Sequence, residues 1–157
     1  MRRKDRAITQ DEAMKVLSKA EYGVLSLVSV IESDIEPYGV PLNFCLMDGA
    51  LFFHCFIEGK KVDCLSRNNK VSFTIVGRTN ILSREFATDY ESVMVFGQAS
   101  EVDDEEKRKP LEGLVQKYSS DYYEEGMNYI NEHFDRVRVF KIEIERITGK
   151  ARNEKSW

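Results

Sequence analysis

Six segments of this chain have the residue pattern of β-strands, and most are separated by only a short turn. Residues 24–31 are apolar on much of both faces, as expected for a strand with two covered faces. Met47-Asp48-Gly49 carries the Asp-Gly signal of a tight hairpin between two of the segments. The six segments are residues 24–31, 38–46, 50–56, 71–76, 92–102 and 137–147.

Helical patterns lie between and beside these strands. Thr9 and Glu12 have the spacing of a capping box, and apolar residues then recur at helical intervals up to residue 20. Further helices are expected at residues 59–67, 103–118 and 122–134, with acidic residues 103–106 at the start of one of them. Residues 78–90 form a polar region without a readable pattern. The combination predicts a mainly β, α+β domain built on an antiparallel barrel with flanking helices.

Composition narrows the class of protein. A length of 157 residues fits a single domain, predicted to span residues 1–157. The net charge of -4 argues against nucleic-acid binding and against a polybasic membrane surface. No apolar stretch approaches the ~20 residues of a membrane helix, so we expect a soluble, cytoplasmic protein. Cys45, Cys55 and Cys64 have no zinc-ligand spacing, and with two histidines no metal site is expected.

Lys60 and Lys61 stand in the first turn of a predicted short helix, directly after Gly59. Cations are unfavourable there because the helix dipole is positive at this end, unless an anion is bound. A phosphate would resolve the conflict, since free N–H groups, a small glycine and two ammonium groups would all face it. The alternative is a solvated lysine pair on a surface helix, and the local pattern leaves both open.

Two other stretches are candidates for function. His54 directly precedes the lysine loop and shares a strand face with Phe52 and Phe56, so we expect it to be partly buried. Gly39 and Pro41 interrupt a predicted strand and would leave backbone groups free to bind a flat polar ring. The alternatives are a structural histidine and an edge strand with a bulge.

Five sequence blocks together resemble a known family. The chain is similar to the nitroimidazole-resistance branch of the pyridoxamine-phosphate-oxidase-like, FMN-binding split barrels. The similarity extends over nearly the whole chain, and the order and spacing of the blocks are specific. The blocks are Tyr38-Gly39-Val40-Pro41-Leu42-Asn43, Phe53-His54-Cys55, Glu58-Gly59-Lys60-Lys61, Asn68-Asn69-Lys70-Val71-Ser72-Phe73 and Ile147-Thr148-Gly149-Lys150-Ala151-Arg152.

The resemblance implies a six-stranded antiparallel split barrel that forms a homodimer with FMN at the interface. It assigns the isoalloxazine and ribityl chain to Tyr38, Gly39, Val40, Pro41, Leu42 and Asn43. It also implies that His54 and Cys55 line the flavin, that Lys60 and Lys61 bind its phosphate, and that Ser92 makes a further contact.

The function implied is that of an FMN-dependent oxidoreductase, which would pass electrons from NAD(P)H to a small organic acceptor, for example a nitroaromatic compound. Pyridoxamine phosphate oxidation is not expected, because the substrate segments of those oxidases are absent from this chain. No catalytic residue is nominated. The alternatives are a non-catalytic flavin carrier or sensor, and a haem-binding split barrel in which His54 would be the axial ligand.

Overall fold

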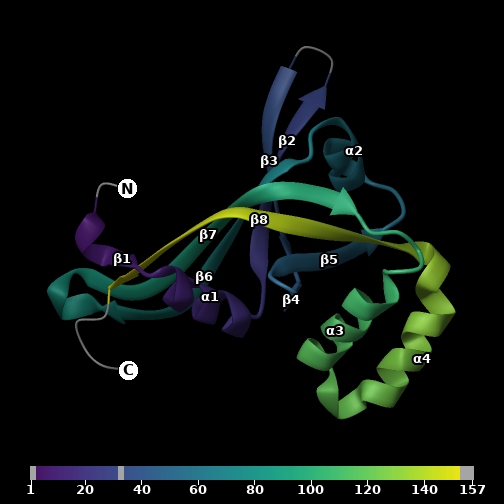
Figure 1. The fold of residues 1–157 in the computed structure, drawn as a ribbon. Coiled ribbons are helices and arrows are strands. Elements are labelled where there is room, and N and C mark those ends of the chain that lie inside the picture. Colours follow the sequence, from purple (N-terminus) through teal and green to yellow (C-terminus); the bar gives the residue numbers. More distant parts are fainter. Residues whose placement is uncertain (1–2, 32–33, 153–157) are drawn as a thin grey trace.

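The computed structural model describes residues 3–31 and 34–152, which form an antiparallel sheet flanked by helices (Figure 1). The sheet has eight strands in the order β3-β2-β6-β7-β8-β5-β4, with β1 paired to β8. The fold is the mainly β, split-barrel α+β architecture that was expected. The strands are β1 (Ala7–Ile8), β2 (Gly23–Ile31), β3 (Asp34–Leu42), β4 (Cys45–Met47), β5 (Ala50–Phe56), β6 (Lys70–Leu82), β7 (Ala87–Glu101) and β8 (Val137–Arg152).

Eight strands form instead of six for two local reasons. The extended run predicted at residues 38–46 is divided at residues 43–44, where β3 ends before the short β4 begins. The two residues of β1 add a strand too short for any sequence pattern, and they pair with Gly149 and Lys150 of β8.

The helices lie in the predicted regions but are shorter than predicted. They are α1 (Gln10–Lys19), α2 (Lys60–Arg67), α3 (Arg108–Tyr118) and α4 (Tyr123–His133), with 3-10 turns at Lys4–Arg6, Ser83–Glu85, Ser120–Tyr122 and Phe134–Arg136. The predicted capping box is present at α1: the Thr9 side chain accepts from the Glu12 N–H, and the Glu12 carboxylate accepts from the Thr9 N–H at 2.8 Å. The acidic residues 103–106 precede α3 as a turn and are not part of the helix.

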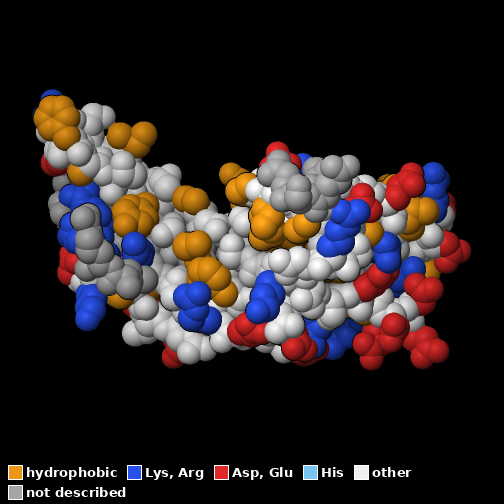
Figure 2. Space-filling view, turned by 90° about the horizontal axis from the view of Figure 1, so that it is seen from above, with side chains coloured by type: hydrophobic (Ala, Val, Ile, Leu, Met, Phe, Trp, Pro, Cys, Tyr) orange, Lys and Arg blue, Asp and Glu red, His pale blue; other side chains and the backbone are white. Residues whose placement is uncertain are grey.

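The hairpin between β4 and β5 has the predicted turn. Asp48 and Gly49 both have positive φ, at 50° and 77°, as a two-residue turn of this kind requires. Residues 78–90 differ from the expectation of an irregular polar region. They extend β6 and β7 into one long hairpin, with a bulge between Val76 and Thr79. Ile81 and Phe86 of this hairpin are exposed whereas Leu82 and Asp89 are buried, so burial here does not follow the polarity of the side chains. Hydrophobic side chains are visible on the surface at the end of the molecule where this hairpin lies (Figure 2).

Two hydrophobic clusters hold the elements together. The larger one fills the interior of the sheet with α1 and α2, and includes the fully buried Phe44, Phe53 and Phe73. The smaller one lies where α3 and α4 pack on the opposite face of β4, β5 and β8, around Leu111 and Val139. β5 and β8 therefore carry apolar side chains on both faces: one face is covered by the main core, and the other by α3 and α4.

Two further features bear on function. In the described part of the chain, no helix is long and apolar enough to span a membrane. Among the same residues, no three His, Cys, Asp or Glu side chains are grouped so that they could hold a metal ion.

Candidate functional site

The N-terminus of α2 is built as the sequence suggested. Gly59 is the N-cap residue with φ of 133°, a conformation that side-chain-bearing residues rarely adopt. No side chain caps the first turn, so its N–H groups have no side-chain partner there. A Cβ atom at Gly59 would have no heavy atom within 4 Å, which leaves open space above the turn. The local geometry suits an anion.

Lys60 and Lys61 reach from this turn to the two edges of the split sheet. The Lys60 Nζ lies 2.7 Å from a carboxylate oxygen of Glu36 and 4.8 Å from the centre of the Tyr38 ring, both on β3. The Lys61 Nζ lies 5.6 Å from the centre of the Phe53 ring on β5. We call this region, formed by Glu36, Tyr38, Phe53, Lys60 and Lys61, the α2 corner.

His54 and Cys55 follow Phe53 on β5 and point to opposite faces of the sheet. Cys55 packs against the main core, and burial raises the pKa of its thiol. His54 is exposed, which corrects the expectation of partial burial. The pKa of His54 is nevertheless lowered, first because nearby protein displaces water and second because Lys61 is positively charged. The two residues therefore flank the α2 corner on different sides.

The segment from Tyr38 to Asn43 forms the end of an edge strand. Tyr38, Val40 and Leu42 pack against the main core, whereas Gly39 and Pro41 are exposed on the other face. The pairing of β3 with β2 is regular from one end to the other, so the bulge considered as an alternative is absent. The free edge of β3 presents backbone groups to solvent or to a ligand.

Ser92 lies apart from the other predicted residues. It is half-buried on β7, where it pairs with Val76 of β6 and Lys150 of β8. In the sheet order, β2 and β6 stand between β7 and the β3 edge. Three strand spacings of about 4.8 Å each therefore separate Ser92 from β3 within one chain.

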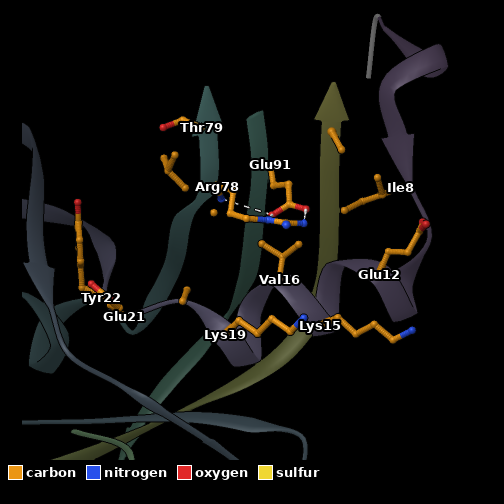
Figure 3. A pocket seen from close by; sticks show the side chains of 14 residues that line it. Ile8, Glu12, Lys15, Val16, Lys19, Glu21, Tyr22, Arg78, Thr79 and Glu91 are labelled. Carbon is orange, nitrogen blue, oxygen red and sulfur yellow. Dashed lines mark hydrogen bonds and ion pairs between the residues drawn. The ribbon is translucent and has the colours of Figure 1, made fainter. Parts of the chain in front are cut away.

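The structure also contains a large groove that sequence reasoning missed. It has a volume of about 630 Å³ and lies between α1 and the bulged hairpin of β6 and β7 (Figure 3). Arg78 and Glu91 form an ion pair at 3.1 Å within it, and Val16 of α1 faces the pair. None of the residues predicted to bind FMN lines this groove. It depends on contacts between distant segments, and only Gly77, at the bulge, gave a local signal.

Comparison with protein families gives a match over most of the chain. A family model described as pyridoxamine 5'-phosphate oxidase matches residues 9–151, which is most of the chain. In a search of curated proteins, none was significantly similar to this chain.

Solved structures with the same fold include proteins with diverse descriptions. A candidate 5-nitroimidazole antibiotic resistance protein from Bacteroides thetaiotaomicron is 26% identical, with a TM-score of 0.71 over 92% of this chain and 85% of that one. A FAD-binding protein from Mesorhizobium loti is 22% identical, with a TM-score of 0.64 over 94% and 98% of the two chains. The flavocytochrome Anf3 from Azotobacter vinelandii is 16% identical, with a TM-score of 0.81 over 98% and 72%.

Proposed function

Because the chain belongs to the pyridoxamine 5'-phosphate oxidase family, we propose that it binds FMN at the α2 corner and acts as an oxidoreductase. The observation that carries the proposal is the pair of lysines at the uncapped N-terminus of α2. A phosphate there would accept hydrogen bonds from backbone N–H groups and from both ammonium groups. The open space above Gly59 leaves room for it.

The flavin ring would lie along the free edge of β3, next to Gly39 and Pro41. Backbone groups on the free edge of that strand would bind the polar atoms of the ring. Lys60, which lies over the Tyr38 ring, would stand between the ring and the phosphate. FMN, when bound, would supply electron or hydride transfer between a nicotinamide donor and a small organic acceptor. The chain itself would orient the ring and exclude water from one of its faces.

Relatives support a flavin ligand. The Mesorhizobium loti protein of the same fold is described as FAD-binding, and the Azotobacter vinelandii protein as a flavocytochrome. The Bacteroides thetaiotaomicron relative is described by resistance to 5-nitroimidazoles, which are nitroaromatic compounds. These descriptions favour flavin chemistry with a nitroaromatic acceptor over pyridoxamine phosphate oxidation.

A homodimer is part of the proposal, because three strand spacings separate Ser92 from the β3 edge within one chain. Val76 and Met94 expose apolar surface on the face of β6 and β7 that carries Ser92, at 63% and 40% of their area. Burying such a face against a second copy would bring Ser92 toward the partner's flavin.

Haem binding is the second candidate, and it has one observation in its favour. A relative from Mycobacterium smegmatis with the same fold is described as FAD- and haem-binding. His54 is exposed with a lowered pKa, and a neutral imidazole is the form that binds iron. A Soret band on haem titration that is lost in His54→Ala would favour this candidate over FMN. A flavin carrier or sensor would bind FMN without turnover.

Two measurements test the proposal. The first is the absorbance spectrum of the purified protein, and the second is its titration with FMN and with riboflavin, which lacks the phosphate. Lys61→Met should weaken FMN binding by about 10-fold or more, as loss of a charge-assisted hydrogen bond implies, and change riboflavin binding little. Lys70→Met, an exposed lysine just beyond α2, is the matched control. Flavin bands that bleach with NADH or NADPH under anaerobic conditions identify an oxidoreductase. A protein that takes up no FMN overturns the proposal.

A further inference from the structure

A second groove lies near the end of α3, away from the lysines of the α2 corner. It has a volume of about 550 Å³ and is formed where the end of α1 and the loop after it approach Asn43 and the last turn of α3. The side chains relevant here are those of Lys19, Glu21, Tyr22, Asn43, Lys117 and Tyr118. We call it the Lys117 groove. Its volume is within the range of small-molecule sites.

Lys117 is fixed at this groove by Phe44. Its Nζ donates a hydrogen bond to the Phe44 carbonyl oxygen at 2.9 Å and lies 3.7 Å from the centre of the Phe44 ring. Phe44 is fully buried and in edge contact with Phe73 of the main core, so the anchor is rigid. The ammonium group is therefore held at a defined position and does not sample many rotamers.

The charge of Lys117 has no acidic partner among the described residues. No ion pair to it is present there, and burial lowers the pKa of its ammonium group. The more buried Lys107 differs, since a carboxylate oxygen of Asp104 lies 2.7 Å from its Nζ. A half-buried ammonium gains most from an anion, because partial removal of water strengthens the attraction.

The other side chains that line the groove indicate what kind of anion would bind there. Lys19 and Glu21 are exposed at the groove and carry opposite charges, which leaves Lys117 as the unbalanced cation. Tyr22 lines the groove and is 59% exposed, so its ring is available for an aromatic ligand to stack on. The exposed Asn43 amide adds a donor and an acceptor. Tyr118 offers little, because its hydroxyl already bonds the backbone of Phe44 and Glu21.

We propose that the Lys117 groove is a binding site for a small aromatic carboxylate, with the carboxylate on Lys117 and the ring against Tyr22. Asn43 would hydrogen-bond the ligand at the mouth of the groove. This site goes beyond flavin binding and does not depend on it, since neither Lys60 nor Lys61 contributes. Asn43 is the one residue common to the groove and to the predicted flavin segment.

The test uses the full chain and benzoate as the probe, with binding followed by ligand-observed NMR and calorimetry. Benzamide has the same ring without the charge, acetate has the charge without the ring, and inorganic phosphate is an anion of another shape. Lys117→Met removes the charge and keeps the stem that packs on Phe44. Lys15→Met, which removes an exposed cation of α1 that does not line the groove, is the matched control.

We expect benzoate to bind wild-type protein about 10-fold more tightly than benzamide or acetate, and Lys117→Met to lose that advantage, as a charge-assisted contact implies. Lys15→Met should change benzoate affinity by less than about threefold, because exposed charges outside the groove contribute little. Equal benzoate affinity in Lys117→Met and wild type overturns the proposal, as does phosphate binding as tightly as benzoate. A protein that takes up no FMN but binds benzoate through Lys117 would uphold this site and overturn the flavin proposal.

Discussion

The carboxylate of Glu36 lies 2.7 Å from the Nζ of Lys60, so a lysine predicted to bind a flavin phosphate already has an acidic partner in the same chain. Both side chains are about half exposed. The hydrogen bond that the Lys60 ammonium group donates to Glu36 raises the pKa of Lys60, which is the direction expected for a lysine that gains an anion. A phosphate arriving at the α2 corner would compete with this carboxylate for the same ammonium group.

Glu36→Gln should therefore strengthen FMN binding. An exposed ion pair is worth about 0.2–1 kcal/mol, so releasing Lys60 should lower the Kd for FMN by at most about fivefold. Riboflavin affinity should not change, because riboflavin has no phosphate. Fluorescence titration of FMN into both proteins measures the effect. Glu105→Gln, an exposed acid before α3, changes the net charge equally and should leave the affinity unaltered. Weaker FMN binding in Glu36→Gln would show that Glu36 supports the site.

The pKa of His54 should report on the charge at the α2 corner. It should titrate below the ordinary value of 6.5, because desolvation and then Lys61 disfavour the charged ring. Lys61→Met should raise this pKa, and bound FMN should raise it too by adding negative charge. Histidine ring signals followed by NMR between pH 4 and 8 measure it. Lys70→Met should have no such effect. An unchanged pKa in Lys61→Met would place Lys61 too far from His54 to act on it.

The same shift makes stability depend on pH. The unfolded chain takes up the proton at His54 before the folded chain does, because only the folded pKa is depressed. The contribution of His54 is thus full above the unfolded pKa near 6.5 and is lost as the pH falls through the folded pKa. The midpoint of urea unfolding should fall less between pH 7 and 5 in His54→Gln than in wild type.

Much of the fold was predictable because local patterns and long-range packing agree. The Thr9 capping box and the Asp48-Gly49 turn are fixed by neighbouring residues, and both are present. The extension of β6 and β7 through residues 78–90 was missed, because this stretch lacks the apolar alternation of a half-buried strand: Phe86 is exposed and Asp89 is buried. Its stability comes from pairing, which a single stretch of sequence does not reveal.

The candidate site was also predictable only in part. Lys60 and Lys61 at the start of α2 follow from Gly59 and the helix pattern alone. The partner of Lys60 could not be predicted in this way, because Glu36 is on β3, far from α2 in the sequence, and the two meet only in the folded chain. The exposure of His54 was also misjudged. Its neighbour on β8, Val139, is buried by α3 and α4, but the helices do not extend over His54.

Tyr118→Phe should destabilise the protein although it removes one oxygen atom. The Tyr118 hydroxyl accepts a hydrogen bond from the Phe44 N–H at 3.0 Å and lies 2.6 Å from the carbonyl oxygen of Glu21. Phe44 is fully buried, so its N–H would lose its partner at a cost of about 1–3 kcal/mol. Urea unfolding measures this cost. Tyr129→Phe, whose exposed ring stacks on His133, should shift stability by less than about 0.5 kcal/mol. Equal effects of the two substitutions would contradict the bridging role.

Gly39→Ala should separate folding from flavin binding. A Cβ atom at Gly39 would meet only a methyl group of Val24, at 3.5 Å, which is an ordinary contact. The free energy of unfolding should therefore change by less than about 1 kcal/mol. The new methyl group would project from the exposed face of β3, directly beside the free edge where the flavin ring is proposed to lie, and should weaken FMN binding by about 10-fold, or ~1.4 kcal/mol. Ser26→Ala, on the β2 residue paired with Gly39, adds no atom to this face and should bind FMN normally. Wild-type FMN affinity in a folded Gly39→Ala variant would mean that the ring lies elsewhere, whereas loss of both FMN and riboflavin binding would place the ring itself, and not only the phosphate, against β3.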